Sequence, residues 1–331
     1  PHSICARRAR RFCGRGWIFK MSFDVIKPGP LSLLQDHGRW GQQQLGISPS
    51  GPADAHAFAW ACYLLGNTRE QACLEITLGP LSLRARSTTH IALTGADLDA
   101  RIDGEPIKAW CTQQIKAGQT LQLGLARAGL RAYLAVPGGF RAEPRYGSCA
   151  TSVREKLGGL HGDGQPLRHG DVLEFAPVAR PARCVPAAYI PDYRNALTLR
   201  LLPGYQFAQF EPAQIERLLS SPYQISAQAD RMGYRLKGDA LQPPMAGLIS
   251  EGIAYGAVQV PPSGQPIVLL NDRQTIGGYP KLGCIAAADA AQLAQRRPGE
   301  SLRFVLTYLD TLSDERWRWE NFFARGPADN T

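Results

Sequence analysis

Short apolar runs, each bounded by Gly, Pro, Asp or Ser, dominate the chain. They include "LSLRAR", "HIALTG", "LQLGL", "RAYLAV", "DVLEF", "LTLRLL", "AVQV", "PIVLL" and "LRFVLTYL". Runs of this length between turn residues are typical of β-strands, and many short strands favour a barrel or sandwich over a βαβ fold. The pattern therefore predicts a mainly-β protein with few helices.

Helical spacing of apolar residues occurs in only three segments, residues 52–65, 211–220 and 289–297. In the first, Ser50 is a candidate N-cap, Pro52 suits the first turn and Asp54 complements the helix dipole. Its apolar residues recur on one side, which predicts that one face packs in the core.

A stretch with little hydrophobic pattern, residues 177–191, carries four prolines and reads as a semi-extended linker. It separates a first half, residues 21–176, from a second half, residues 192–331. Both halves begin with a strand that ends in Pro-Gly, at residues 28–29 and 203–204. This echo suggests a duplicated fold, which would place a cleft between two related units.

Positive charge is concentrated at the N-terminus. Of 37 Lys and Arg residues, six lie in residues 1–20, which contain no acid, so 31 basic residues face 28 acidic ones elsewhere, a net of +3. Such a small excess does not predict binding to nucleic acid or a membrane surface. We expect Met21 to be the natural start and residues 1–20 to come from upstream translation; a targeting signal is the alternative, although the continuous apolar segment of a secretory peptide is missing.

The sequence lacks several common functional motifs. It has no phosphate-binding P-loop, no G-x-S-x-G nucleophile elbow and no third ligand beside His161 and His169, so we expect no metal site. No Met-Lys-Met sequence occurs, so biotin is not carried on this chain. No apolar stretch is long enough to span a membrane. Eight scattered cysteines without a C-x-x-C pair predict reduced, mostly buried thiols in a cytoplasmic protein.

The densest concentration of chemistry is "PIVLLNDRQTIGGYPK", residues 266–281, where an apolar strand opens into a loop of polar and charged residues. Functional side chains concentrate on loops that a rigid sheet positions, and paired glycines let backbone N–H groups approach a ligand. A long hairpin with a solvated tip is the alternative. The candidate catalytic residues are Arg231, Asp272 and Lys281, and the candidate substrate-binding residues are Asp230, Gln259, Gln265, Gln274, Thr275, Gly278 and Tyr279.

Arg231 follows Asp230 directly, and a neighbouring carboxylate that fixes a guanidinium creates a fork for a carboxylate or phosphate. A structural ion pair is the equally weighted alternative. The first half contains a second possible cleft, in which a helix N-terminus is suited to an anion. Its candidate residues are Gln35, Asp36, Arg39, Asp54 and Glu75, and Glu75 either faces outward from its strand or lies in the cleft.

Several of these segments together resemble one family. They are "QDHGRWG", "GISPSGPAD", "LEITLGP", "YLAVPGGF", "GSCATS", "GGLHGDGQPLRHGD", "DRMGYRL", "GAVQVPPSGQPIVLLNDRQTIGGYPK" and "PGESLRF". In this order they look like the family of bacterial 5-oxoprolinase C subunits, also called KipA-like. That family is similar to allophanate hydrolase subunit 2 and to the carboxyltransferase domain of urea carboxylase. The resemblance runs from Met21 to about Phe304, and Cys149 departs from it where a basic residue is expected.

The resemblance implies two tandem cyclophilin-like β-barrel domains in a cytoplasmic heteromeric enzyme. A KipI-like protein, the B subunit, would act with this chain to activate 5-oxoproline (pyroglutamate) with ATP and Mg²⁺. A lactam-utilisation-like protein, the A subunit, would open the ring to L-glutamate. In that reaction Arg231 and Lys281 would neutralise phosphate charge, while Gln259, Gln265, Gln274 and Thr275 would orient the substrate.

Two other functions stay open from the sequence. One is a carboxyltransferase component that acts on urea or a related amide, with biotin on a partner chain. The other is a KipA-type regulator that antagonises a kinase inhibitor. A cleft of amides with one arginine suits pyroglutamate, urea and allophanate alike.

Overall fold

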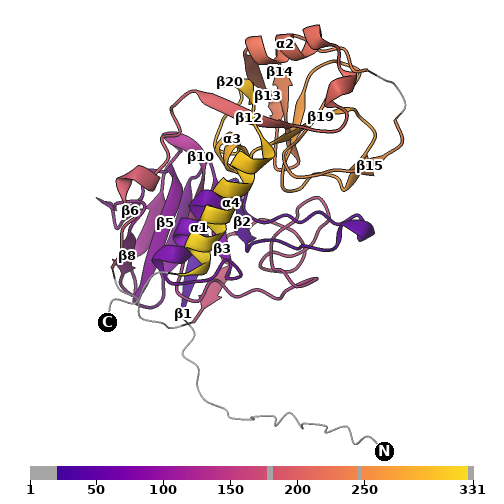
Figure 1. Ribbon diagram of the computed structural model, residues 1–331. Coiled ribbons are helices and arrows are strands. Elements are labelled where there is room, and N and C mark those ends of the chain that lie inside the picture. Colours follow the sequence, from indigo (N-terminus) through magenta and orange to yellow (C-terminus); the bar gives the residue numbers. More distant parts are fainter. Residues whose placement is uncertain (1–20, 177–181, 245–247, 327–331) are drawn as a thin grey trace, which may run out of the picture.

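The computed structural model describes residues 21–176, 182–244 and 248–326 of the 331-residue chain. Residues 1–20 and the start of the linker, residues 177–181, lie outside the described residues. The chain forms two β units that lie against each other (Figure 1). Most regular structure is strand, as the apolar pattern predicts, and the helices are few.

The first half is built from two antiparallel sheets packed around a common core. The six-stranded sheet has the order β11 (Val172–Phe175), β1 (Met21–Lys27), β4 (Leu81–Ala85), β9 (Thr120–Leu123), β6 (Arg101–Ile102), β7 (Glu105–Pro106). The five-stranded sheet has the order β2 (Leu31–Gln35), β3 (Cys73–Thr77), β10 (Ala128–Ala135), β5 (Thr89–Asp97), β8 (Thr112–Ile115). Phe23 and Leu83 from the first sheet meet Leu74 and Leu134 from the second in this core.

Helix α1 (Ala55–Leu64) covers the outer face of the five-stranded sheet, packing on β5 and β10. Its cover explains why every residue of β3 is buried, including Glu75, instead of alternating between core and solvent. The N-cap is Asp54, whose carboxylate accepts a hydrogen bond from Ala57 N. The predicted cap, Ser50, is wrong: Ser50 adopts a positive φ of 55° and lies in the turn that precedes the cap.

The second half contains a closed seven-stranded barrel. Its order is β12 (Leu197–Pro203), β19 (Lys281–Ile285), β16 (Ala257–Gln259), β17 (Ile267–Leu269), β14 (Gly233–Lys237), β13 (Tyr223–Ala229), β20 (Ser301–Leu306). A two-stranded sheet, β15 (Glu251–Gly252) with β18 (Ile276–Gly277), lies beside it. The two predicted helices of this half are present as α2 (Pro212–Ser220) and α3 (Ala287–Leu293). Short 3₁₀ turns occupy Gln43–Leu45, Ala187–Tyr189 and Phe207–Gln209.

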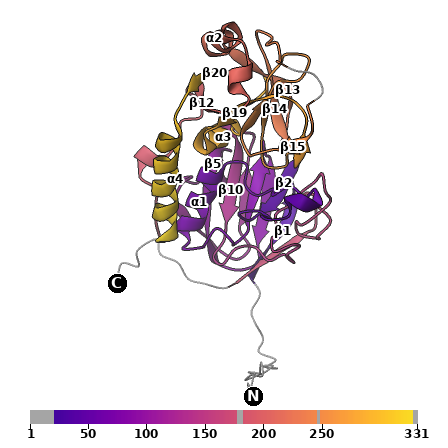
Figure 2. The ribbon, with the colours of Figure 1, turned by 45° about the vertical axis from the view of Figure 1, so that its right-hand side comes forward.

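A C-terminal helix, α4 (Leu309–Ala324), leaves the barrel and runs along α1 of the first half, as both views of the ribbon show (Figures 1 and 2). Phe322 and Phe323 meet the rings of Trp60 and Tyr63 on α1 at centroid distances of 5.3–5.9 Å. The end of the second half therefore also covers the first.

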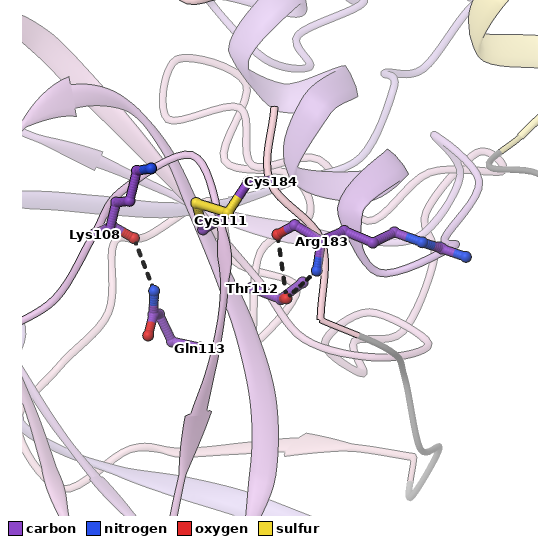
Figure 3. Close-up of a disulfide and its surroundings, with 6 residues drawn as sticks. All are labelled: Lys108, Cys111, Thr112, Gln113, Arg183 and Cys184. Carbon is purple, nitrogen blue, oxygen red and sulfur yellow. Dashed lines mark hydrogen bonds between the residues drawn. A yellow bond between two sulfur atoms is a disulfide. The ribbon is translucent and has the colours of Figure 1, made fainter. Parts of the chain in front are cut away.

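A disulfide joins Cys111, just before β8, to Cys184 in the linker (Figure 3). Beside it, Thr112 N donates to Arg183 O at 2.8 Å and Arg183 N donates to Thr112 Oγ1 at 2.7 Å, so the linker is held along the edge of β8. The prediction that the cysteines are reduced is wrong for this pair, because the two lie 73 positions apart in the sequence and only the fold brings them together. Cys62, Cys73, Cys149 and Cys284 are free.

Candidate functional site

A cavity of about 220 Å³ lies where the two halves and α4 meet. The first half contributes Ser50 and Trp40, the second half Asn271 and Arg273, and α4 contributes Trp319. The other lining residues are His37, Pro49, Pro52, Ala55, Phe58, Arg69, Tyr255, Ala287, Arg316 and Glu320. Because three separate parts of the chain form its wall, the cavity exists only in the assembled molecule.

Arg273 is a buried cation in this wall, with 6% of its surface exposed. Its Nε donates to Ile253 O at 3.0 Å and its Nη1 to Leu270 O at 3.1 Å, while its guanidinium lies 5.8 Å from the ring centre of Tyr255. Among the described residues no carboxylate forms an ion pair with it, and burial lowers the pKa of Arg273. Tyr255, Cys284 and Asp272 act in the opposite direction but only partly offset the burial, so the wall presents a positive charge whose desolvation is incompletely compensated.

Ser50 and Asn271 lie side by side in the wall. Ser50 N donates to Asn271 O at 3.3 Å, and Asn271 Nδ2 donates to Ser50 O at 3.1 Å and to Pro52 O at 3.0 Å. The remaining polar atoms of the two side chains, Ser50 Oγ and Asn271 Oδ1, are buried and have no hydrogen-bond partner among the described residues. Unpaired buried polar atoms are uncommon in folded proteins and mark a place where a ligand is missing or strain is stored.

Helix α4 closes the cavity on one side. The ring of Trp319 contacts two guanidinium groups, that of Arg69 at 4.8 Å and that of Arg316 at 5.1 Å from the ring centre. Glu320 forms ion pairs with both arginines. These contacts connect α4 to the first half, while an ion pair of Glu315 with Arg200 at 2.6 Å connects it to the barrel.

A buried charge cluster connects the halves next to the cavity. Arg231 Nη1 lies 2.6 Å from Glu75 Oε1, its Nε lies 2.8 Å from Asp272 Oδ2, and its Nη2 donates to Gly51 O at 2.6 Å. Tyr133 Oη donates to the other oxygen of Glu75 at 2.8 Å. Burial alone lowers the pKa of Arg231, but Asp272 and Glu75 raise it above its ordinary value. Protein acceptors thus bind all three nitrogens of the guanidinium, through four hydrogen bonds.

The structure brings three predicted site residues together, Arg231, Asp272 and Glu75, although sequence reasoning assigned Glu75 to a different cleft. It also corrects the predicted partner of Arg231, because Asp230 instead accepts hydrogen bonds from Met232 N at 2.8 Å and Gly233 N at 3.2 Å and thereby caps its own turn. Asp54 joins the same region from the start of α1, where Tyr193 Oη donates to it at 2.9 Å.

A second group of predicted residues lies apart from the cavity. Lys281 Nζ forms an ion pair with Glu251, and Lys281 is paired in register with Gln259 across β19 and β16. The amides of Gln259 and Gln274 approach each other beside Gly277, where an added Cβ would lie 3.2 Å from both nitrogens. None of these residues lines the cavity.

The other candidates from the loop have local roles. Gln265 exchanges hydrogen bonds with the backbone of Gly238, at 2.9 Å and 3.1 Å, and closes a turn of the barrel. Tyr279 is 42% exposed, and an added Cβ at Gly278 would lie 2.8 Å from Leu248 O. Thr275 contributes its carbonyl, which accepts a hydrogen bond from Ile253 N at 3.0 Å.

The remaining residues of the second predicted cleft form a buried network. Asp36 accepts from Ser148 Oγ at 2.6 Å and from Cys149 N at 2.8 Å. Arg39 donates to three backbone carbonyls between residues 145 and 150, and Gln35 donates to Thr151 O at 3.1 Å. These contacts fix the segment around Cys149, whose thiol pKa burial raises. None of the three predicted residues lines the cavity.

Sequence reasoning missed Ser50, Asn271 and Arg273 as site residues. One signal was present, because Asn271 and Arg273 flank Asp272 in the loop that the sequence singles out. These residues lie in a turn in which Arg273 N donates to Leu270 O at 3.3 Å, so strand alternation could not predict the direction of each side chain. Within the described parts of the chain, no group of His, Cys, Asp or Glu is arranged to hold a metal ion.

Comparison with known proteins identifies relatives over most of the chain. The sequence model described as "Carboxyltransferase domain, subdomain A and B" matches residues 45–306. The chain is 39% identical over 302 residues to the 5-oxoprolinase C subunit of Escherichia coli, covering 91% of this chain and 96% of that protein. It is 35% identical over 283 residues to the 5-oxoprolinase C subunit of Haemophilus influenzae, covering 85% and 90%. A "Putative urea carboxylase" of Emericella nidulans is 34% identical over 88% of this chain, which covers only 25% of that protein.

Solved structures share the fold. The crystal structure of TTHA0988 is 34% identical, superposes with a TM-score of 0.78 and covers 86% of this chain, which spans 55% of that one. The Kluyveromyces lactis urea amidolyase superposes with a TM-score of 0.86 over 93% of this chain, which spans 20% of that one, at 24% identity. No helix in the described residues is both long and apolar enough to cross a membrane.

Proposed function

The chain belongs to the carboxyltransferase domain family, subdomains A and B, and from this membership we propose that it is the C subunit of an ATP-dependent 5-oxoprolinase. Sequence identity supports this choice. The chain is 39% and 35% identical to two proteins named as 5-oxoprolinase C subunits, but 28% and 26% identical to two proteins named as urea amidolyases. In this proposal it works with the B and A subunits.

The structural observation that carries the proposal is the cavity of about 220 Å³, whose wall holds a buried arginine without an ion-pair partner in the described chain and two unpaired polar atoms suited to an amide. 5-Oxoproline is a compact anion with one amide, and it suits a cavity of this size. A ring amide is a poor electrophile, so transfer of a phosphoryl group from ATP to its oxygen makes water addition and ring opening to L-glutamate feasible. In this proposal the chain holds and orients the amide.

ATP does not fit the residues that the sequence suggested for it. All three guanidinium nitrogens of Arg231 are bound by Glu75, Asp272 or Gly51, and Lys281 is paired with Glu251. The cavity is also smaller than the roughly 300–1,000 Å³ of pockets that take larger organic ligands. As part of the proposal, ATP with its Mg²⁺ binds to the B subunit, and Arg231 connects the two halves of this chain.

The test is reconstitution. The chain is mixed with its cognate B and A subunits, and release of ADP and glutamate is followed with and without 5-oxoproline. We expect turnover that requires this chain, ATP and 5-oxoproline together. A mixture that forms a stable complex but releases no glutamate would contradict the proposal.

Carboxyl transfer to urea or a related amide, from biotin on a partner chain, is a second candidate. It is favoured by the description of the matching family and by the identity to the putative urea carboxylase. Adding a carboxylated biotin carrier and urea to the chain separates the two candidates, because only a carboxyltransferase would consume carboxybiotin when urea is present.

A further inference from the structure

We propose that the cavity binds a small molecule that carries a carboxylate together with a ring amide, that Arg273 binds the carboxylate, and that Asn271 and Ser50 bind the amide. The inference rests on the proposed function for its choice of ligand. It goes beyond that function by assigning a residue to each recognised chemical group, and this assignment predicts which amides the site rejects.

The charge of Arg273 is the first step. Its Nε and Nη1 are bound by backbone carbonyls, and its Nη2 has no hydrogen-bond partner among the described residues. The two other arginines of the cavity, Arg69 and Arg316, already share Glu320. Within the described chain, Arg273 is thus the arginine of the cavity wall that forms no ion pair, although the charge of Asp272 acts on it from a distance. A ligand carboxylate would add a direct counter-charge and accept a charge-assisted hydrogen bond.

The orientation of Asn271 is the second step. Its Nδ2 donates to Ser50 O and Pro52 O, so the amide cannot be reversed without losing both hydrogen bonds. Asn271 Oδ1 is therefore an acceptor that lacks a donor, which calls for a ligand N–H. Ser50 Oγ beside it carries a rotatable O–H that can donate to a ligand carbonyl.

The geometry of amides is the third step. In a ring amide the N–H and C=O groups lie on the same edge, whereas in an ordinary open-chain amide they point in opposite directions. Two adjacent wall residues, one an acceptor and one a donor, match the ring form. Urea offers such an edge but no carboxylate, and proline offers a carboxylate but no amide. 5-Oxoproline has both, and the rings of Trp40 and Tyr255 provide an apolar wall for its methylene groups.

The experiment is calorimetric titration of the full chain, alone and in complex with its partner subunits. Four probes are used: 5-oxoproline, 2-pyrrolidinone, which has the ring amide without the carboxylate, L-proline and urea. We expect 5-oxoproline to bind most tightly, and 2-pyrrolidinone and L-proline about 10–100-fold more weakly, since each lacks one recognised group.

Two variants assign the groups. Ser50→Gly removes the hydroxyl and suits the positive φ of 55°, so the backbone is preserved. It is expected to weaken the binding of 5-oxoproline and of 2-pyrrolidinone by about 3–10-fold and to leave the binding of L-proline unchanged. Arg273→Lys keeps the charge but loses the Nη2 donor and the planar guanidinium that the backbone carbonyls hold in place. It is expected to weaken the binding of 5-oxoproline by about 10-fold or more and to leave the binding of 2-pyrrolidinone unchanged. Thermal unfolding checks that both variants are folded.

The inference would be overturned if 5-oxoproline bound neither to the chain alone nor to the complex. It would also be overturned if the two variants weakened the binding of all four probes equally, or of none of them. These outcomes are distinct from failure of the proposed function. ATP-dependent turnover with unchanged variants would remove the residue assignment and keep the function. Selective binding without turnover would keep the assignment and remove the function.

Discussion

At the scale of single residues, Arg231 shows how a buried charge can be structural rather than catalytic. Its side chain is 5% exposed, and it has a carboxylate from each half, Glu75 and Asp272. Water cannot replace a lost partner at such a site. Removal of the guanidinium would leave two carboxylates buried together without this counter-charge.

We therefore predict that Arg231→Leu lowers the free energy of unfolding by about 3–5 kcal/mol, measured by urea denaturation. The matched control is Arg235→Ala in the same segment, an exposed arginine, which should change stability by less than about 0.5 kcal/mol. A variant Arg231→Leu as stable as Arg235→Ala would show that the cluster does not hold the halves together.

Glu75 leads to a prediction about pH. Burial alone raises the pKa of Glu75, but Arg231 and Arg131 outweigh it and lower the pKa below its ordinary value of 4.5. As the pH falls, Glu75 of the unfolded chain is therefore protonated before Glu75 of the folded protein. The ionised carboxylate stabilises the folded protein above about pH 4.5, and this stabilisation is lost as the pH falls through the lowered pKa. The free energy of unfolding of Glu75→Gln should be lower at pH 7 and should fall less steeply than that of the wild type between about pH 5 and pH 3. Parallel pH curves for the two proteins would contradict this assignment.

At the scale of elements, the sequence predicted strands and helices where each has its own pattern. Strand β4 alternates buried residues with more exposed ones, as predicted. Helix α1 is where the apolar spacing predicts a helix, but six consecutive residues, Ala57 to Cys62, are buried, so the helix is covered on nearly every side and not on the one face that was predicted. Helix α4 was missed because none of its residues is buried, and its aromatic residues acquire a partner only when it lies on Trp60 and Tyr63. A surface helix of this kind depends on tertiary contacts more than on its own pattern.

The two tryptophans of α4 allow a matched test of its docking. Trp319 contacts the guanidinium groups of Arg69 and Arg316, whereas Trp317 is 67% exposed. We predict that Trp319→Ala weakens docking by about 1–2 kcal/mol, so that backbone amides of α4 exchange hydrogen roughly 5–30-fold faster. Trp317→Ala should leave the exchange rates nearly unchanged. Equal acceleration by both variants would mean that helix propensity, not the contact with Arg69, holds α4 in place.

At the scale of the whole molecule, the candidate site depends on how the two halves meet, and this could not be predicted from a local pattern. Sequence reasoning found the loop of residues 266–281 and noted Glu75, but placed them in separate clefts. In the structure, Arg231 connects Glu75 of the first half to Asp272 of the loop. Ser50, also from the first half, contacts Asn271 of the same loop. The pairing of Cys111 with Cys184 was missed for the same reason, because it requires the linker to lie along β8.

Gln295 offers a test of whether the halves act as one unit. It is fully buried, and its Nε2 donates to Asp54 Oδ2 and to Arg131 O, both at 2.8 Å, while its Oε1 accepts from Leu130 N and Arg131 N, also at 2.8 Å. These partner atoms all belong to the first half, so one amide from the second half satisfies them. Truncation leaves several buried polar groups unpaired, each of which costs about 1–3 kcal/mol.

We predict that the wild-type chain unfolds in a single calorimetric transition, because neither half can satisfy these groups alone. Gln295→Ala should lower the free energy of unfolding by at least about 2 kcal/mol and broaden the transition or split it into two. Gln292→Ala, about one turn earlier in α3 at a half-buried position, is the control and should keep the single transition. Two separate transitions in the wild type would mean that each half is stable by itself, and the cavity between them would then depend on a docking equilibrium rather than on folding.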